Sequence, residues 1–338
     1  MKHTIVPGRA VTEEPILSVE GLKVYFYTDN GVVPGVDDLS FTLHRNETLA
    51  IAGESGCGKS VTSLSILRIV QRPGRIVGGR ILYDGRDLLT LKESAMRKIR
   101  GNDISMVFQE PMTSLNPVFT VGDQIVWGLV EHQHMTRAQA RRHAAEMLRT
   151  VRIPEPERCL RRYPFELSGG MRQRVMIAMA LASNPKVLIA DEPTTALDVT
   201  IQAQILRLLD DLKHEVGTQI ILITHDLGVV AHMAQNVMIM YMGKMVEYGD
   251  VESMFANPLH PYTIGLLRSI PRMREKQDTL FSIRGSVPEP GNYPDGCLFH
   301  PRCEQAMDIC CKKAPPLCML SGKRKVACWK YGEAMANG

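Results

Sequence analysis

One short segment has the residue types and spacing needed to bind a phosphate chain. Residues 53–60 read GESGCGKS, which fits the pattern G-x-x-x-x-G-K-S and lies between an apolar run and a segment with helical spacing. Glycines let the backbone fold tightly around an anion, so that its N–H groups and the following helix N-terminus face the phosphates. We expect Lys59 to reach the β- and γ-phosphates and the Ser60 hydroxyl to ligate Mg²⁺. The predicted nucleotide-binding set is Gly53, Glu54, Ser55, Gly56, Cys57, Gly58, Lys59, Ser60 and Val61.

A pair of carboxylates stands at the end of a second apolar run. Residues 187–192 read VLIADE, with four apolar residues followed by Asp191 and Glu192. A buried strand that ends in Asp places this residue at the carboxyl edge of the sheet. It would lie there beside the phosphate-binding loop of residues 53–60, the P-loop. Asp191 would hold Mg²⁺ directly or through water, and Glu192 would orient and polarise the attacking water as general base.

A second glycine pair precedes another helical segment. Residues 167–171 read LSGGM, so Ser168 and the amides of Gly169 and Gly170 form a second phosphate-binding helix N-terminus. One chain cannot easily direct two such ends at one γ-phosphate when the P-loop already encloses it. We therefore expect two ATPase chains, each closing its glycine pair over the nucleotide of the other.

The elements that must position these motifs follow an alternating order. Residues 16–60 alternate apolar and polar side chains, which predicts antiparallel strands that lead into a buried strand at 49–52. Residues 110–167 are rich in helical patterns and are expected to form an inserted helical subdomain. The remaining expected elements are helices at 60–70, 169–183, 199–216 and 226–234, strands at 187–190 and 220–224, and a hairpin at 237–250. Strands that alternate with helices imply a mostly parallel, covered sheet.

Composition excludes some classes of partner and of membrane attachment. The 338 residues are 44% hydrophobic with a formal net charge of +4, which is too mild to imply a nucleic-acid partner. The local group of basic residues is interpreted as a solvated helix face; it comprises Arg141, Arg142, Arg149, Arg152, Arg158, Arg161 and Arg162. The residues before Leu17 lack a secretory pattern, and no apolar run approaches the ~18 residues that span a bilayer. A membrane role must therefore come through a partner.

The ordered set of motifs resembles the ATPases of ABC transporters. LSGG precedes the Asp-Glu strand end, and the segments VFQEP, Ala196-Leu197-Asp198 and a strand ending before His225 occur in the family's order. The resemblance covers residues 17–255. It implies that Gln109 senses Mg²⁺ and the γ-phosphate and couples to a membrane subunit, that His225 contacts the γ-phosphate, and that Asp198 links two sites across a dimer.

The same resemblance assigns an aromatic residue to the adenine base. Phe26 matches best, with Tyr25 and Tyr27 as alternatives and a core-facing strand residue as the structural alternative. Met171 stands where glutamine is common in the family. The LSGG segment is called the signature below. Since its residues Ser168, Gly169 and Gly170 are present, we expect it to bind a partner's nucleotide.

The last part of the chain carries a further motif and a cysteine group. HPYT-x-x-LL at residues 260–267, followed by VPEP, resembles the extension on ATPases of dipeptide, oligopeptide and nickel importers. Four cysteines resemble the same family's cluster motif, which implies a four-iron, four-sulfur cluster bound by Cys297, Cys303, Cys310 and Cys328. Zinc or free thiols are the alternatives, and Cys311 competes with Cys310 as a ligand. Cys318 is a further, unassigned cysteine.

Together these observations predict an α/β P-loop NTPase of ABC type. We expect an antiparallel β subdomain, the helical subdomain at about 110–170, an ATPase domain over 16–255, and an extension over 256–338 with a small cysteine-rich module. The resemblance implies an ATP- and Mg²⁺-dependent subunit at the cytoplasmic face of the membrane that energises di- or oligopeptide import. Its partners would be two transmembrane permeases, a second, paralogous ATPase and an extracytoplasmic solute-binding protein. The alternatives are an importer of nickel or glutathione and a soluble ABC ATPase that acts on nucleic acid.

Overall fold

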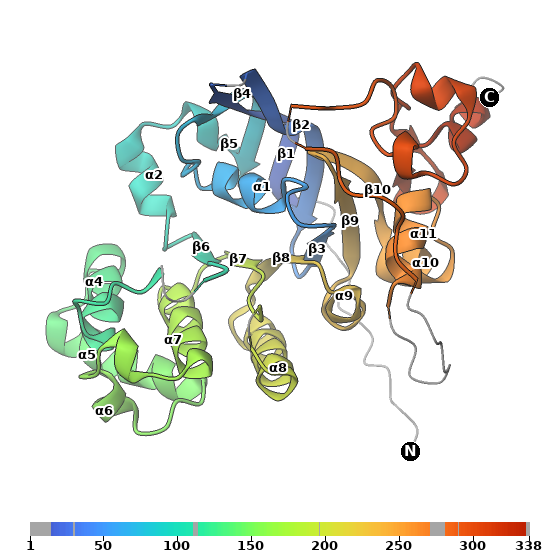
Figure 1. Ribbon diagram of the computed structural model, residues 1–338. Coiled ribbons are helices and arrows are strands. Elements are labelled where there is room, and N and C mark those ends of the chain that lie inside the picture. Colours follow the sequence, from blue (N-terminus) through green and yellow to red (C-terminus); the bar gives the residue numbers. More distant parts are fainter. Residues whose placement is uncertain are drawn as a thin grey trace.

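The chain folds around two sheets (Figure 1), and the computed structural model describes residues 15–29, 31–110, 114–195, 197–270, 281–289 and 291–335. The smaller sheet has the strand order β2-β1-β4-β5 and the larger one the order β11-β12-β10-β9-β3-β8-β7-β6. The strands are β1 (Pro15–Thr28), β2 (Gly31–His44), β3 (Thr48–Ala52), β4 (Gly74–Tyr83), β5 (Arg86–Asp87), β6 (Ile104–Val107), β7 (Val187–Asp191), β8 (Gln219–Thr224), β9 (Asn236–Tyr241), β10 (Lys244–Asp250), β11 (Cys318–Met319) and β12 (Lys325–Val326).

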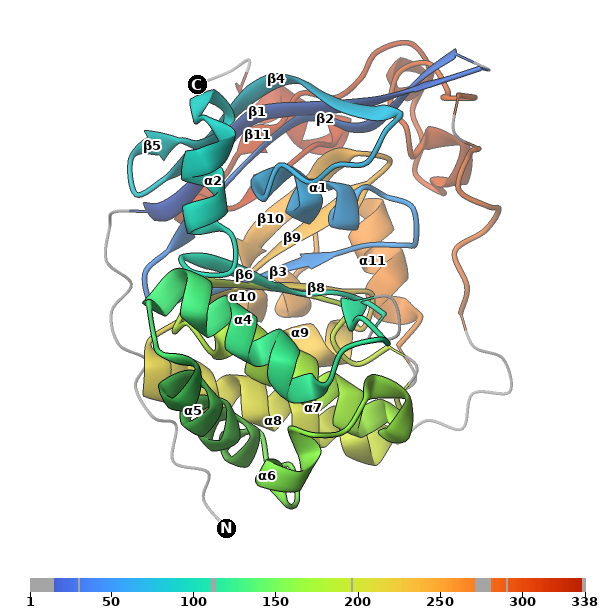
Figure 2. The same cartoon turned by 90° about the vertical axis from the view of Figure 1, so that its left-hand side faces the viewer.

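The helices pack on both faces of the larger sheet and to one side of it (Figures 1 and 2). They are α1 (Lys59–Ile66), α2 (Glu93–Ile99), α4 (Val121–Gln133), α5 (Arg137–Thr150), α6 (Pro156–Cys159), α7 (Gly169–Leu181), α8 (Val199–Val216), α9 (Leu227–Met233), α10 (Val251–Ala256) and α11 (Pro261–Arg268). Short 3₁₀ turns are η1 (Leu88–Thr90), η2 (Pro164–Glu166), η3 (His300–Arg302), η4 (Asp308–Cys311), η5 (Ser321–Lys323) and η6 (Trp329–Met335).

The centre of the larger sheet is parallel, as the alternation of strands and helices predicts. Strand β3 pairs with β8 and β9, and β7 pairs with β8 and β6, all in parallel register. Alternate residues of these strands enter two different cores. Ile189 and Ile221 belong to the core shared with α1 and the smaller sheet, whereas Leu188 and Leu222 belong to the core shared with α7 and α8. Both faces are therefore covered, which explains the continuous apolar runs.

Helices α4, α5, α6 and α7 lie together below the parallel sheet, where the helix-rich segment is expected (Figure 2). Helix α5 begins with a capping box, because Thr136 accepts from the Gln139 backbone N–H while the Gln139 side chain accepts from the Thr136 N–H. Leu129 and Leu148 are fully buried in the same core as the β7 side chain Leu188. This group of helices is therefore packed on the end of the sheet that carries β6 and β7.

The smaller sheet is antiparallel and covers α1 (Figure 2). Residues 74–107, for which the sequence pattern predicts no elements, supply β4, β5, α2 and β6. The group of arginines expected to be solvated lies mainly on α5 and near α6. Arg141, Arg142, Arg149 and Arg161 line a shallow hollow together with Glu146 and Glu157, so both signs of charge mix there. Within the described part of the chain, no helix has the length and apolar content needed to cross a membrane.

The C-terminal segment (residues 281–335) differs from the small appended module expected from sequence. Strand β12 pairs with β10 through Glu247 and Tyr248, and β11 pairs with β12, so the segment extends the ATPase sheet at its edge. The Glu247 side chain is fully buried and accepts a hydrogen bond from Arg324 at 2.6 Å. Composition changes sharply near residue 281, but it does not reveal that this stretch pairs with the edge of the ATPase sheet at β10.

Candidate functional site

The P-loop runs from the end of β3 to the start of α1 and lies where the sequence predicts. Gly58 precedes the helix with φ 99°, and a Cβ there would lie 2.4 Å from the Gly35 carbonyl oxygen. A Cβ on Gly53 would lie 2.3 Å from the Met240 carbonyl oxygen. Only glycine fits at these two positions, because the loop is pressed against the neighbouring backbone. The tip of the loop, Ser55 and Gly56, is exposed.

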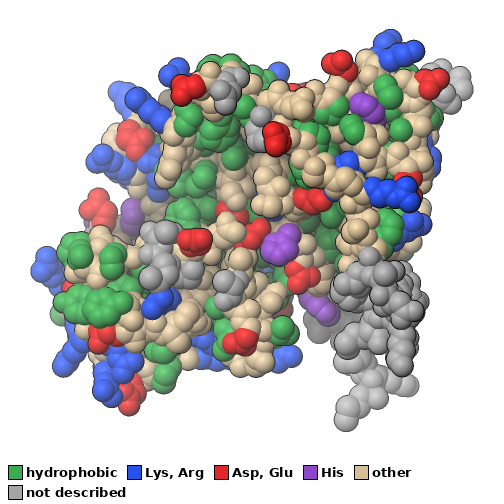
Figure 3. Space-filling model, in the orientation of Figure 1, with side chains coloured by type: hydrophobic (Ala, Val, Ile, Leu, Met, Phe, Trp, Pro, Cys, Tyr) green, Lys and Arg blue, Asp and Glu red, His purple; other side chains and the backbone are tan. Residues whose placement is uncertain are grey.

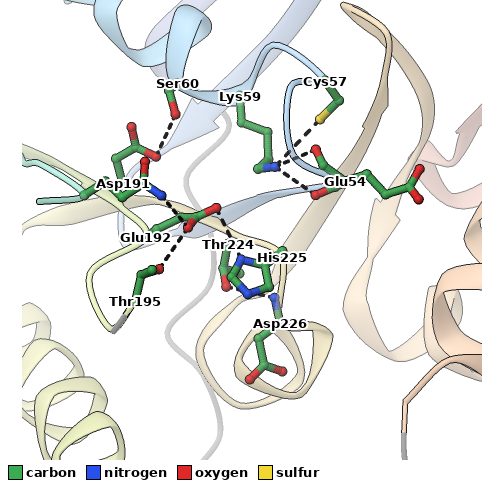
Figure 4. A network of polar contacts seen from close by, with 12 residues as sticks. Glu54, Cys57, Lys59, Ser60, Asp191, Glu192, Thr195, Thr224, His225 and Asp226 are labelled. Carbon is green, nitrogen blue, oxygen red and sulfur yellow. Dashed lines mark hydrogen bonds and ion pairs between the residues drawn. The ribbon is translucent and has the colours of Figure 1, made fainter. Parts of the chain in front are cut away.

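Lys59 extends into the loop that it follows (Figure 4). Its ammonium group donates to the carbonyl oxygens of Gly53 at 2.8 Å and Glu54 at 2.9 Å, and the residue is 5% exposed. The thiol of Cys57 lies 3.8 Å from the same nitrogen, and burial raises the pKa of this thiol. The loop therefore surrounds a buried positive charge, which is the arrangement needed to bind a polyphosphate.

Ser60 and Asp191 face each other at the edge of the sheet. The Ser60 hydroxyl donates to Asp191 Oδ1 at 3.2 Å (Figure 4). Asp191 is 4% exposed, and burial raises the pKa of its carboxyl group to about 6, opposed by the hydrogen bond from Ser60. A hydroxyl and a carboxylate side by side are ligands that Mg²⁺ accepts, so these two residues fit the predicted metal site.

Glu192 is held by side chains from three different loops (Figure 4). Gln109 Nε2 donates to Glu192 Oε2 at 2.9 Å, Thr195 Oγ1 donates to the same oxygen at 2.9 Å, and His225 Nδ1 lies 3.3 Å from Oε1. Glu192 adopts φ 44°, a left-handed conformation that non-glycine residues rarely adopt and that clusters at functional sites. Its backbone N–H donates to the Ile223 carbonyl oxygen at 2.9 Å, which fixes this turn to β8.

The environment of Glu192 favours its ionised form. Burial alone raises the pKa of this carboxyl group, but hydrogen bonds from Thr195 and His225 outweigh it and hold the pKa below the ordinary value. Asp191 and Glu192 are adjacent in sequence and yet have pKa values shifted in opposite directions. The site therefore presents a charged, hydrogen-bonded carboxylate beside a buried one, a combination suited to general-base chemistry.

The signature residues, Ser168, Gly169 and Gly170, lie at the start of α7 and close to α8. Ser168 is the N-cap of α7, and its hydroxyl accepts from the Met171 N–H at 3.4 Å. Ser168 and Gly169 are exposed, and a Cβ on Gly170 would lie 3.1 Å from Ile201. Asp198 is the N-cap of α8 and is exposed. Ala196 lies outside the described residues.

Phe26, the first choice for the adenine contact, is partly buried. Its ring lies against Gly35 and Gly74, where a Cβ on either glycine would come within 2.8 Å of it. This packing matches the structural alternative of a core-facing strand residue. Tyr27 is 45% exposed, with the Arg75 guanidinium 5.3 Å from its ring centre, and the Tyr25 hydroxyl donates to Asp37 at 3.0 Å. The adenine contact stays a prediction.

Three residues of this neighbourhood were not predicted from sequence. Thr195 reaches Glu192, while Tyr262 and Arg302 reach the P-loop at Glu54. Tyr262 is part of the HPYT motif, which is the single signal that pointed to it. Nothing in the spacing around Arg302 indicates its contact, because 248 residues separate it from Glu54.

The four predicted cluster cysteines come together. Cys297, Cys303, Cys310 and Cys328 line one cavity with Trp329, and burial raises the pKa of the Cys297 thiol to about 11, to which the other three thiols add. Cys311 is exposed and does not line this cavity, whereas the buried Cys318 thiol lies 3.7 Å from the Pro316 carbonyl oxygen.

The spacing of these thiols bears on what they could hold. Among the residues that the structure describes, no three His, Cys, Asp or Glu side chains are close enough together for a single metal ion. A polynuclear group accepts thiolates that stand farther apart than the ligands of one zinc ion, whose bonds to sulfur are about 2.3 Å long. The four cysteines that line this cavity are the residues available to hold such a group.

Two protein families match parts of the chain. The ABC transporter family matches residues 36–195, and the family "Oligopeptide/dipeptide transporter, C-terminal region" matches residues 246–310. The oligopeptide transport ATP-binding protein AppD of Bacillus subtilis (strain 168) is 52% identical, over 95% of this chain and 98% of that protein. OppD of Escherichia coli (strain K12), also an oligopeptide transport ATP-binding protein, is 48% identical over 98% and 97% of the two chains.

The fold is similar to solved ATP-binding cassettes. The dimeric, post-hydrolysis structure of the ATP-binding cassette MJ0796 bound to ADP and Pi has a TM-score of 0.63 at 26% identity, covering 70% of this chain and 98% of that one. The nucleic-acid alternative is not favoured, since the names of the relatives above describe oligopeptide transport. By its motifs, its fold and these relatives, the chain belongs to the ABC transporter family of ATP-hydrolysing subunits, in the group that carries the oligopeptide/dipeptide transporter C-terminal region.

Proposed function

We propose that this chain hydrolyses ATP at the site formed by the P-loop, Asp191 and Glu192 to drive the import of di- or oligopeptides. The convergence of Gln109, Thr195 and His225 on the Glu192 carboxylate carries the catalytic part of this proposal. The near full-length similarity to two oligopeptide transport ATP-binding proteins supports the cargo class. In our division, residues 16–255 form the ATPase domain and residues 256–338 the extension.

Binding of the nucleotide depends on a change of partner at Lys59. Its ammonium group leaves the carbonyl oxygens of Gly53 and Glu54 and pairs with the β- and γ-phosphates, while the amides of residues 56–61 surround the phosphate chain. Ser60 and Asp191 would hold Mg²⁺, which neutralises charge on the phosphates when bound. Burial raises the pKa of Asp191, and a divalent cation beside this carboxylate would favour its ionised form.

Hydrolysis depends on the ionised carboxylate of Glu192. It accepts a proton from the attacking water and holds that water in line with the γ-phosphate. The hydrogen bonds from Gln109 and Thr195 to one carboxylate oxygen, and the contact with His225 at the other, fix its orientation. Gln109 and His225 are then in reach of the γ-phosphate side of the site, which is the role that the family resemblance gives them.

The second half of the site comes from another ATPase chain. Ser168 and Gly169 are exposed at the start of α7, so their amide and hydroxyl groups are open to a neighbour. The similar cassette MJ0796 was solved as a dimer bound to ADP and Pi, which supports a sandwich in which the signature of one chain covers the nucleotide of the other. Asp198, exposed at the start of α8, lies on this shared surface in our proposal.

Exposed apolar side chains on the helical subdomain support a contact with the permeases at this surface. Val118 is 69%, Trp127 46% and Phe165 63% exposed, and Phe119 packs edge-to-face on Trp127. Hydrophobic side chains gather over this part of the molecule in Figure 3. Large exposed apolar groups of this kind mark protein–protein contacts. Docking there would connect the permeases to Gln109 and would hold the chain at the cytoplasmic face of the membrane.

We also propose that Cys297, Cys303, Cys310 and Cys328 hold a four-iron, four-sulfur cluster. All four line one cavity, and Cys310 rather than Cys311 is the lining residue of the adjacent pair. When bound, such a group would be held by four thiolates and would fix the C-terminal segment in place.

Uptake by the reconstituted transporter tests the proposed cargo. The chain, its permeases and the solute-binding protein would be placed in liposomes that contain ATP, and accumulation of a radiolabelled tripeptide would be measured. Unlabelled di- and oligopeptides should compete, whereas nickel and glutathione should not. ATP-dependent accumulation of labelled nickel or glutathione, with no accumulation of the tripeptide, would reject the cargo class and leave the ATPase assignment intact.

A further inference from the structure

Two residues of the C-terminal part of the chain bind one residue of the P-loop. The Glu54 backbone N–H donates to the Tyr262 hydroxyl at 2.8 Å. The Glu54 carboxylate accepts two hydrogen bonds from the Arg302 guanidinium, Nη1 to Oε2 at 2.6 Å and Nη2 to Oε1 at 3.0 Å. These contacts join positions that are 208 and 248 residues apart in sequence.

Arg302 is held firmly in this position. Its side chain is 5% exposed, its Nε donates to the Arg284 carbonyl oxygen at 3.0 Å, and its guanidinium lies 5.9 Å from the ring centre of Tyr241. A two-point contact between a guanidinium and a carboxylate fixes the orientation of both groups as well as their distance. Tyr262 is fully buried and likewise fixed. The P-loop is therefore attached at Glu54 to a rigid part of the C-terminal region.

Glu54 connects these contacts to the residue that binds phosphate. Its carbonyl oxygen accepts the hydrogen bond from Lys59 at 2.9 Å, while its side chain extends away from Lys59 (Figure 4). Lys59, Tyr262 and Arg302 thus each bind a different group of the same residue. These three contacts together fix the position of the peptide between residues 53 and 54. They therefore also fix the shape of the P-loop around the phosphate site.

The contact with Arg302 also compensates the negative charge of Glu54. A loop that binds a triphosphate contains a carboxylate, which repels the ligand unless a cation compensates it. Arg302 supplies that cation at hydrogen-bonding distance. If the guanidinium is removed, a partly buried negative charge remains beside the phosphate site without its partner, and such uncompensated charges are strongly unfavourable.

We propose that Arg302 is a positioning residue of the nucleotide site: it neutralises Glu54 and, together with Tyr262, holds the P-loop in the shape that accepts ATP. The C-terminal segment thereby sets the affinity of the chain for nucleotide. Arg302 ends the turn η3 and is followed directly by Cys303, which lines the cysteine cavity. A rearrangement of this cavity would therefore move Arg302 and, through it, Glu54 of the P-loop. This coupling does not depend on which group the cysteines hold.

Equilibrium titration with mant-ATP and Mg²⁺ on the full chain tests the proposal. Arg302→Gln should raise the Kd by about tenfold, within the range usual for coupling between two sites. Tyr262→Phe removes the acceptor of a single hydrogen bond and should raise the Kd by about threefold. Arg284→Gln is the matched control, because this arginine lies in the same segment with its side chain 84% exposed, and its Kd should stay within about twofold of the parent.

A rescue experiment separates positioning from a general effect on folding. Glu54→Gln removes the charge that Arg302 compensates, so the double variant with Arg302→Gln should bind mant-ATP more tightly than Arg302→Gln alone. In the transporter complex, Arg302→Gln should raise the KM for ATP, while kcat at saturating ATP stays within about twofold. Equal or weaker binding by the double variant, or an unchanged Kd for Arg302→Gln, would overturn the proposal.

A further variant covers the case in which Arg302→Gln does not fold, as judged by circular dichroism. Arg302→Lys keeps the charge but loses the two-point geometry, and should give a Kd between those of the parent and Arg302→Gln. An unchanged Kd in both Arg302→Lys and Tyr262→Phe would equally reject a positioning role.

Discussion

Gln109 donates a hydrogen bond to Glu192 at 2.9 Å, although 83 residues separate them in sequence. Gln109 follows β6 and Glu192 follows β7, and these two strands are neighbours in parallel register. His225 follows β8, the next strand of the same sheet. The order of three strands therefore brings three polar side chains together at one edge, as expected where the carboxyl ends of parallel strands meet. A displacement of the segment around Gln109 acts directly on the carboxylate that we assign as general base.

Glu192→Gln should reduce ATP hydrolysis by at least about 100-fold, because an amide keeps the size of the side chain but accepts no proton. Dimers with bound Mg-ATP should accumulate and would be detected by light scattering. Thr195→Val is a useful comparison, since it removes one hydrogen bond to Glu192 and keeps the carboxylate. Its loss of activity should be much smaller. Turnover of Glu192→Gln near the parent rate would contradict the assignment of the base.

Asp191→Asn should stabilise the nucleotide-free chain and weaken its binding of Mg-ATP. The pKa of Asp191 in the folded chain is about 6, above its ordinary 3.8, so ionisation above pH 6 destabilises the fold and this penalty vanishes as the pH falls below 4. At pH 7.5 the substitution should increase the free energy of unfolding by roughly 3 kcal/mol. Urea unfolding at pH 7.5 and pH 4 would measure the difference, which should shrink at the lower pH. A less stable variant at pH 7.5 is incompatible with this account.

Cys57 should react with N-ethylmaleimide far more slowly than Cys311. Cys57 is 2% exposed and burial raises the pKa of its thiol, whereas Cys311 is exposed. Reactivity follows thiolate content and access, so we expect a difference of at least about tenfold. Mass spectrometry of the two peptides over time gives both rates in one sample. Mg-ATP should slow the reaction of Cys57 further and leave that of Cys311 unchanged; equal effects at both sites would count against the loop geometry.

Cys310→Ser and Cys311→Ser should have opposite outcomes for bound iron. Cys310 is buried and lines the cavity with the other three cysteines, whereas Cys311 points elsewhere and is exposed. Purified without oxygen, the Cys311→Ser chain should keep its iron and its brown colour, and the Cys310→Ser chain should lose most of both. Iron and sulfide analysis provides the measurement. A parent chain that carries zinc but no sulfide would reject the proposed cluster.

Replacing Trp127 and Phe165 together by serine should weaken attachment to the permeases. Both side chains are large, apolar and about half exposed or more, so the change removes contact area without leaving a cavity in the core. Binding of mant-ATP to the isolated chain should stay within about twofold of the parent. Val77→Ser, which changes an exposed apolar residue on the smaller sheet, is the control. Co-purification of tagged permeases would report the effect, and full retention of both variants would exclude this surface.

The motifs and the elements beside them could be predicted because their signals are local. The P-loop needs glycines within eight residues, and β7 and β8 are short apolar runs flanked by polar residues. Strand β4 has no such signal, since Gly78 and Gly79 interrupt its alternation. The contacts of Arg302 could not be predicted from the sequence either, because a pairing across 248 residues depends on the complete fold. Packing also decides what the Phe26 ring touches, and residue type alone does not reveal this.

The pairing of β12 with β10 has a consequence for any shortened form of this protein. A chain cut after residue 255 would leave an unprotected sheet edge at Glu247 and Tyr248, open to pairing with other molecules. It would also leave the buried Glu247 carboxylate without its hydrogen-bond donors. These donors are the Leu259 and His260 amides and the Arg324 side chain. We therefore expect a truncated ATPase core to aggregate, and loss of activity in such a fragment would say nothing about a regulatory role of the tail.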